Sequence, residues 1–240
     1  AATSSDATCS SASGAQAALP CPAGTYSTAD AAPVTVCSNP GQGSCARSTA
    51  SDNSCSTSAG AQASLSCPEG TYNDVATAVT LGCKNPGAGK CASANGSICS
   101  SSAGAVTVAN CPAGTYHDGQ SATSTCNNPG IGKCAAATSG SNSCSASAGA
   151  QAALPCPVGT YSASTSAVTA CSNPGIGNCV AATSSDATCS SSAGSQAALP
   201  CPAGTYSSST GSVTGCLYPG KGRCTRATSS SSSCSYSAVG

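Results

Sequence analysis

The sequence predicts small disulfide-rich tandem repeats, formed mostly of short β strands and irregular segments, with a period of about 45 residues. We expect the repeats to stack as an elongated rod or solenoid. Three observations support this fold class: 21 cysteines in 240 residues, very few large apolar side chains, and a cysteine spacing that recurs along the whole chain.

Large apolar side chains are too scarce for an ordinary hydrophobic core. Val, Leu and Ile number 20 of 240 residues, and Phe, Trp and Met are absent. At roughly 25 cal/mol per Å² of buried apolar surface, burial alone cannot offset the entropy lost on ordering the chain. Disulfides that close loops of 12–16 residues would contribute about 3 kcal/mol each, and they persist in oxidising compartments. We therefore expect an extracellular or cell-surface protein.

The cysteines define five copies of one four-cysteine pattern, with gaps of 12, 15 or 16, and 8 residues. Residues 1–27 match residues 181–207 at 24 positions, so the chain opens in the middle of its own repeat. We assign copies one to five to 9–54, 55–98, 99–143, 144–188 and 189–233, preceded by the tail of a repeat (1–8) and followed by the start of another (234–240).

The pairing of the cysteines stays open among three arrangements per copy. We expect the third to pair with the fourth, as in Cys37–Cys45, and the first with the second, as in Cys9–Cys21. Cys234 is a candidate for an inter-copy or intermolecular disulfide, with a partner beyond the sequence. The structural disulfide candidates are Cys9, Cys21, Cys37, Cys45, Cys55, Cys67, Cys83, Cys91, Cys99, Cys111, Cys126, Cys134, Cys144, Cys156, Cys171, Cys179, Cys189, Cys201, Cys216 and Cys224.

The first recurring segment is Cys-Pro-x-Gly-Thr-Tyr, which begins at the second cysteine of each copy, as in Cys21–Tyr26. Pro fixes φ and Gly permits a turn, so the backbone should reverse beside the disulfide. We expect the Tyr ring to cover that disulfide and its hydroxyl to contact water. Carbohydrate stacking on the tyrosines is the alternative. The preceding GAQAALP segment spans under two helical turns before its Pro, so helix is not favoured.

The other recurring segments predict a strand, a turn and a connector. Val-Thr alternation at 33–37, 78–83, 167–171 and 212–216 predicts a strand of three to five residues. Asn-Pro-Gly, as in CSNPGQGSC at 37–45, predicts a type II turn with positive φ at Gly. The Ser/Thr-rich segments between copies are interpreted as solvated connectors and candidate O-glycan sites.

Asn95-Gly96-Ser97 is an N-glycosylation sequon in a turn-like context, which makes Asn95 a glycosylation candidate. Asn53-Ser54-Cys55 and Asn142-Ser143-Cys144 resemble the rare variant with Cys in third place. Use of that variant would compete with the disulfide.

The CPxGTY motif resembles the cysteine-rich tandem repeats of two groups of extracellular surface proteins. These are the immobilisation (surface) antigens of ciliates and the ephrin-receptor-like cysteine-rich repeats. The ciliate antigens are also similar in their Ala/Ser/Thr-rich, aromatic-poor background. The resemblance covers about six residues per copy, and it implies a secreted, disulfide-bonded coat protein that is often lipid-anchored in the ciliate case.

Catalytic, metal-binding and cofactor-binding residues are not predicted. His117 has Ser at the equivalent position of three other copies, so it is interpreted as a solvated turn residue. No Ser/His/Asp set can be assigned, and no copy offers converging oxygen ligands for calcium. Seven basic residues balance seven acidic ones, so no nucleic-acid partner is expected, and no apolar run is long enough to span a membrane.

We therefore expect a non-enzymatic structural protein that self-associates into a filament, surface coat or cell-surface hair, with glycans attached. An adhesin or receptor-type module that binds glycan or protein is the alternative. In that case the variable residue of the Pro-Gly loop, Ile131 and Ile176 in copies three and four, would mark the contacts. Ice binding is disfavoured because Thr does not recur at a short period.

Overall fold

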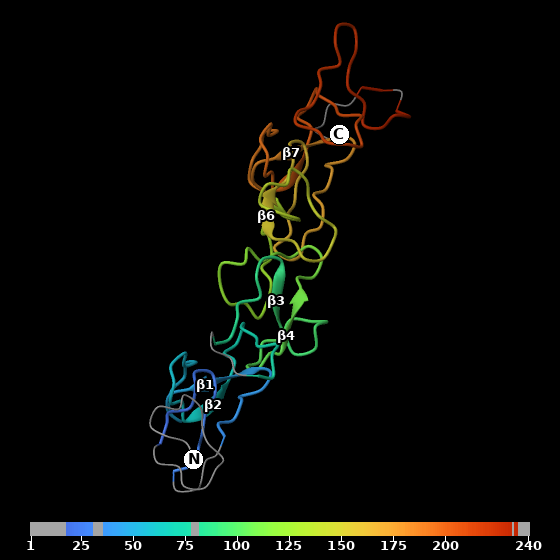
Figure 1. Cartoon of the computed structure of the whole chain (residues 1–240). Coiled ribbons are helices and arrows are strands. Elements are labelled where there is room, and N and C mark those ends of the chain that lie inside the picture. The colour runs from blue at the N-terminus through green and yellow to red at the C-terminus, as the bar shows by residue number, and fades with distance from the viewer. Residues whose placement is uncertain (1–17, 31–35, 78–81, 232, 235–240) are drawn as a thin grey trace. The chain divides into compact units, whose positions relative to one another are not determined.

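The computed structural model describes residues 18–30, 36–77, 82–231 and 233–234 (Figure 1). These residues form eight strands of four residues each and no helix. They belong to two compact units, one formed by Ala1–Cys111 with Asp118–Cys126 and the other by Pro112–His117 with Asn127–Gly240. In the described ranges, no helix has the length and apolar character needed to cross a bilayer.

The first unit contains two antiparallel two-stranded sheets. Strand β1 (Ser44–Arg47) pairs with β2 (Ala63–Ser66), and β3 (Lys90–Ser93) pairs with β4 (Thr107–Asn110). In both sheets the first strand carries the fourth cysteine of one copy, and the second strand belongs to the following copy. Each sheet is therefore shared by two copies.

The second unit repeats this arrangement. Strand β5 (Lys133–Ala136) pairs with β6 (Ala152–Pro155), and β7 (Asn178–Ala181) pairs with β8 (Ala197–Pro200). Strands β6 and β8 are formed by the sequence AALP, so the alanine-rich segment is extended, in agreement with the expectation that it is not helical. A Pro at the end of a short two-stranded sheet is tolerated there because its missing N–H is not needed in the interior of a ladder.

The predicted Val-Thr strands are wrong at the two places where the structure describes the segment fully. Residues 167–171 and 212–216 contain no strand, whereas 33–37 and 78–83 lie partly outside the described residues. Val168 is nevertheless buried, and its N–H donates to the Gly114 carbonyl at 2.9 Å. The valines thus fill the interior singly, and the strands form where two copies can pair their backbones.

The predicted turns are confirmed. In the CPxGTY segment, the N–H and the hydroxyl of Thr25 both donate to the Pro22 carbonyl, and Gly24 has a φ of 82°. In the Pro-Gly loop, Gly41 has a φ of 84°, which the third position of a type II turn requires. Both turns recur in the other copies, so the backbone reverses beside each within-copy disulfide.

The interior consists of sulfur atoms and small apolar side chains. Among the described residues, the buried hydrophobic side chains are those of Cys, Ala and three valines. Val180 is the largest fully buried apolar side chain. This confirms the predicted fold class: disulfide-rich, strand-containing repeats of about 45 residues in which cystines take the place of a large apolar core.

Candidate functional site: the junction between copies

The disulfides follow a different pairing from the predicted one. The second cysteine of each copy bonds to the third, and the fourth bonds to the first cysteine of the next copy. The within-copy bonds are Cys21–Cys37, Cys67–Cys83, Cys111–Cys126, Cys156–Cys171 and Cys201–Cys216. The between-copy bonds are Cys45–Cys55, Cys91–Cys99, Cys134–Cys144, Cys179–Cys189 and Cys224–Cys234.

The predicted Cys37–Cys45 and Cys9–Cys21 bonds are therefore wrong. The Pro-Gly turn places Cys45 in strand β1, which pairs with the next copy, so Cys45 bonds to Cys55 while Cys37 bonds to Cys21. Cys9 itself lies outside the described residues. The expectation that Cys234 has its partner beyond the sequence is also wrong, because Cys234 bonds to Cys224 and joins copy five to the start of the next copy.

Two disulfides lie side by side at each of four junctions. At the first, the Sγ atoms of Cys55 and Cys83 are 3.5 Å apart, so the between-copy bond contacts the within-copy bond of the next copy. The equivalent distances at the other three are 3.7–3.9 Å. The Sγ atoms of Cys45, Cys55 and Cys83 all lie within 4.8 Å of one another. Metals are bound by thiolates, and because these sulfurs are paired in disulfides, we interpret the cluster as packing.

The sequence did not predict a further residue that holds the junction, namely the residue after the Tyr of each CPxGTY segment. Asn73 in copy two is fully buried, and its carbonyl accepts from the Gly43 N–H of copy one at 2.9 Å. Its own N–H donates to Ala105 of copy three at 3.1 Å. Its side-chain Nδ2 also donates to Gly41 and Ser44 of copy one. One residue thus connects three successive copies.

Ser162 occupies the same position in the second unit. Its carbonyl accepts from the Gly132 N–H at 2.7 Å, and its N–H donates to the Ser195 carbonyl at 3.2 Å. His117 is the equivalent residue of copy three and is only 2% exposed, with its N–H donating to Ala150. The prediction that His117 is a solvated turn residue is therefore wrong. The sequence carried no signal of this burial, because the Ser, Asn and His residues that follow the Tyr of the CPxGTY segments are also common in solvated turns.

The tyrosines of the CPxGTY segments link neighbouring copies through their backbones. Tyr72 forms an antiparallel bridge with Lys84 of its own copy and a parallel bridge with Ala105 of the next. Tyr161 does the same with Ser172 and Ser195. Both side chains are half-buried. That their rings cover a disulfide stays a prediction.

The connectors between copies were predicted to be solvated. The structure corrects this, because they are only partly solvated. The residues that open them, Ala46, Ala92, Ala135 and Val180, are fully buried in strands. Ser93, Ala136 and Ala181, the second residues of three connectors, are buried as well. Exposed tips follow at 48–51, 94–98, 137–140 and 182–185, and the disulfide at the base closes each tip into a loop. The predicted domain boundaries lie in these loops and stay a prediction, although the between-copy disulfides cross them.

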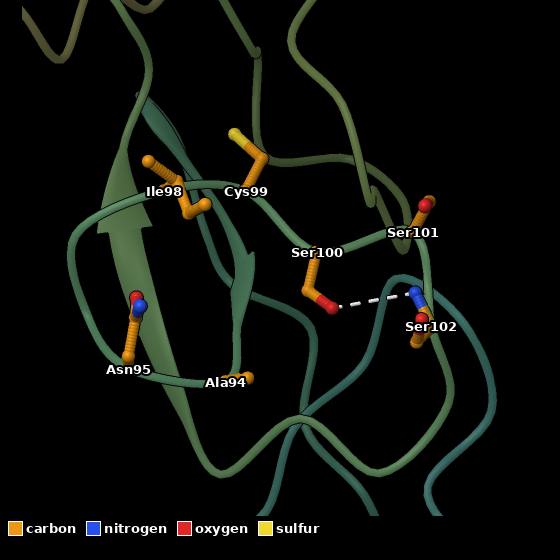
Figure 2. Close-up of a pocket in the computed structure, with 7 residues that line it drawn as sticks. All are labelled: Ala94, Asn95, Ile98, Cys99, Ser100, Ser101 and Ser102. Carbon is orange, nitrogen blue, oxygen red and sulfur yellow. Dashed lines mark hydrogen bonds between the residues drawn. The ribbon is translucent and has the colours of Figure 1, made fainter.

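The connector of copy two differs from the others, because its disulfide spans 8 residues and theirs span 10. It contains the glycosylation candidate Asn95, which is exposed. Figure 2 shows that Asn95 lines a small pocket together with the neighbouring loop residues. These residues are Ala94, Ile98, Cys99, Ser100, Ser101 and Ser102.

An ion pair between Lys84 and Asp74 supplements these contacts. The Lys84 ammonium lies 2.8 Å from an Asp74 carboxylate oxygen and 5.9 Å from the centre of the Tyr72 ring. The hydrogen bond from Lys84 holds the pKa of Asp74 below its ordinary value, and the same bond raises the pKa of Lys84. Both side chains are nearly half exposed, so water and salt screen the attraction.

Comparison with models of known protein families gave no match, and comparison with the curated proteins gave none either. Interpretation of the junction therefore depends on its own geometry. Covalent bonds, shared sheets and hydrogen bonds from the residue after Tyr all connect one copy to the next. The junction therefore joins each repeat to the next by both covalent and noncovalent contacts.

Proposed function

We propose that the chain is a structural component of an extracellular filament, surface coat or cell-surface hair, without catalytic activity. The observation that carries this proposal is the bond from the fourth cysteine of each copy to the first of the next, placed beside a sheet that the same two copies share. Mechanical continuity between modules is what such an arrangement supplies.

The disulfides limit how far a pulled chain can extend. In copy two, Cys67–Cys83 bypasses one loop and Cys91–Cys99 bypasses the connector. Residues 55–67 and 83–91 remain extensible, and at about 3.5 Å per residue they span at most about 70 Å. A fully reduced copy of about 45 residues would reach about 160 Å. The hydrogen bonds of Asn73 and the shared strands secure these remaining segments in the folded state.

An extracellular setting is supported by the disulfides, which persist in oxidising compartments. The similarity of the CPxGTY segments to ciliate surface antigens and to ephrin-receptor-like repeats supports the same setting. Low charge and small side chains suit a resistant coat. Attached glycans, at Asn95 or on the Ser/Thr-rich tips, belong to this proposal.

Self-association is expected to be head-to-tail, because the junction joins two different faces of the repeat. Such heterologous contacts give open filaments when the rotation does not close. The secreted, oxidised chain should form linear assemblies in electron microscopy whose length increases with protein concentration. A chain that sediments as a monomer at every concentration would contradict the proposed self-association.

Pulling on single molecules tests the mechanical part of the proposal. We expect each copy of the oxidised chain to lengthen by less than half as much as a copy of the fully reduced chain. Equal increments in the two states would show that the disulfides do not limit extension, and the proposed structural role would then fail.

An adhesin or receptor-type binding module is the second candidate. Ile131 and Ile176 occupy the variable position of successive Pro-Gly loops and are 43% and 61% exposed. These are two of the few large aliphatic side chains of the chain, and in this second candidate they are the residues that contact the bound molecule. A glycan array and a cell-binding assay test this, with an Ile131→Gln, Ile176→Gln double variant as the control. Binding no stronger than that of the variant would reject this candidate.

A further inference from the structure

We propose that Asn95 carries an N-linked glycan whose first sugar covers Ile98 and shields the Cys91–Cys99 disulfide. The inference rests on the extracellular setting of the proposed function, since the modification belongs to the secretory route. It goes further by assigning the residue, the surface that the sugar contacts and the bond that it protects.

The loop of copy two is built differently from the other connectors. In copies one and four, the loop is closed by an Asp carboxylate that accepts from a Thr N–H, as Asp52 does from Thr49 at 2.8 Å. In copy two, the fully buried Ser93 replaces this device: its hydroxyl donates to the Ile98 carbonyl at 2.6 Å and accepts from the Gly96 N–H at 2.9 Å. The buried Ser93 hydroxyl therefore holds the backbone of this short loop by hydrogen bonds.

The fixed loop presents the Asn95 side chain outward. The Asn95 Oδ1 atom accepts from the Ser97 N–H at 3.0 Å, which forms an Asx turn across the sequon. Gly96 has a φ of 80°, which this tight turn requires. The amide oxygen is thus engaged by the loop itself, and Figure 2 shows the Asn95 side chain directed toward the part of the loop that carries Ile98.

The modification has a simple bond balance. The Asn95 amide nitrogen attacks the anomeric carbon of an oligosaccharide linked to a polyprenyl diphosphate. A carbon–nitrogen glycosidic bond forms, the bond from the anomeric carbon to the diphosphate oxygen breaks, and the polyprenyl diphosphate leaves. One proton departs from the amide nitrogen, and no oxidant or reductant is needed.

One large apolar side chain, Ile98, lies beside Asn95 on a surface otherwise rich in serine, and a sugar ring can cover it. Ile98 is 68% exposed, although large aliphatic side chains are rare in this chain. It lines the same pocket as Asn95 and the half-exposed Cys99 (Figure 2). A sugar attached at Asn95 and lying on Ile98 would remove apolar surface from water. It would also obstruct the approach of a thiol to Cys99, on which thiol–disulfide exchange depends.

The chain supplies its own matched controls. Asn53 and Asn142 are also exposed and are each followed by Ser-Cys. Their third residues, Cys55 and Cys144, are bonded to Cys45 and Cys134, so the thiols that would replace the sequon hydroxyl are consumed. We therefore expect both asparagines to stay unmodified.

The test is peptide mass spectrometry on the full chain secreted from a eukaryotic host, before and after enzymatic removal of N-glycans. We expect a glycan at Asn95 alone, and its loss in Ser97→Ala and Asn95→Gln. In the same samples, differential alkylation should show that a dithiol reduces Cys91–Cys99 several-fold faster once the glycan is absent. The rate at Cys134–Cys144, whose neighbour Asn142 is expected to stay unmodified, should not change.

Each outcome decides a separate part. An unmodified Asn95 in a chain whose described disulfides are formed would overturn this inference and leave the proposed structural function intact. A glycan at Asn95 that leaves the reduction rate of Cys91–Cys99 unchanged would overturn the shielding. Disulfides that fail to form in the secreted chain would instead contradict the proposed function.

Discussion

Cys179 and Cys224 occupy the same position in copies four and five, yet Cys179 is fully buried and Cys224 is exposed. Both form a between-copy disulfide over ten residues. Their exposure differs because only one of the two cysteines lies in a strand that pairs with the following copy. Cys179 belongs to strand β7, which pairs with β8 of the following copy, whereas no described residue forms a strand with the segment around Cys224.

A copy therefore does not bury its own fourth cysteine. The following copy does so, by adding a strand and by placing its own within-copy disulfide alongside. Tyr206 supports the same conclusion, because it is more exposed than the tyrosines of the earlier copies, whose parallel bridges come from the next copy. The stability of each repeat is thus expected to depend on its neighbour.

The largest difference in unfolding free energy between the positions of Cys179 and Cys224 should come from removing the disulfide at each. Cys179→Ala with Cys189→Ala should lower the unfolding free energy of the second unit by about 3–5 kcal/mol, through lost loop closure and a disrupted junction. Cys224→Ala with Cys234→Ala should alter only the segment around that bond. Chemical denaturation monitored by circular dichroism compares them, and equal losses would show that the following copy contributes nothing.

Gly132 and Gly222 occupy equivalent positions in copies three and five and share the same left-handed backbone conformation. Gly132 has a φ of 71° and Gly222 a φ of 72°. Ala at either position should cost about 1–2 kcal/mol of left-handed strain. At Gly132 the new Cβ would also meet the Gly194 carbonyl oxygen of a later copy, whereas nothing lies within 4 Å at Gly222.

Gly132→Ala should therefore destabilise by about 1–3 kcal/mol more than Gly222→Ala, the usual cost of overpacking. Thermal unfolding of the two variants measures this difference. Indistinguishable midpoints would mean that Gly194 does not pack against the Pro-Gly loop in solution.

A smaller effect on the unfolding free energy is expected when the residue after Cys179 or after Cys224 is replaced by Ala. Val180 is fully buried between copies, so Val180→Ala should cost about 2 kcal/mol. Thr225, its half-buried equivalent, should tolerate Ala within about 0.5 kcal/mol. The unfolding free energies of these two single variants give the measurement, and a costly Thr225→Ala would contradict the assignment of burial to the next copy.

The smallest effect should come from the Asp74–Lys84 pair, which lies within copy two and away from both positions compared. Because the pKa of Asp74 is lowered, the pair stabilises above the ordinary carboxyl pKa and loses its effect as the pH falls through the lowered value. Because the pKa of Lys84 is raised, the effect is also lost as the pH rises through that raised value.

Asp74→Asn should therefore shift the thermal midpoint slightly at neutral pH and low salt, and not at all in strong acid or high salt. Differential scanning calorimetry across pH and salt provides the test. A shift that persists in acid would assign the effect to something other than the ion pair.

The sequence predicted the repeat, its turns and its cystine-rich interior, because these depend on local residue types. Pro22 and Gly24 define their turn within four residues, and the cysteine spacing gives the period directly. The absence of helix in AALP was likewise predictable from its length and its Pro.

The pairing of Cys45 with Cys55 was not predictable from spacing, because it depends on strand β1 leaving its own copy to pair with the next. Most of the strands gave little signal, since they consist largely of Ala, Ser and Cys, which lack the β-branched character that marks an ordinary strand. Strand β4, with Thr107 and Val108, is the exception. The burial of Asn73 and His117 was missed because polar residues after a turn are usually solvated. Here both residues can be buried because their polar groups are hydrogen-bonded to neighbouring copies.

Peptide mapping of the secreted protein without reduction shows whether a disulfide joins each repeat to the next. We predict peptides that join Cys45 to Cys55, Cys134 to Cys144 and Cys179 to Cys189, together with separate within-copy pairs such as Cys67–Cys83. Free thiols at these positions, or bonds confined to single copies such as Cys37–Cys45, would contradict this prediction.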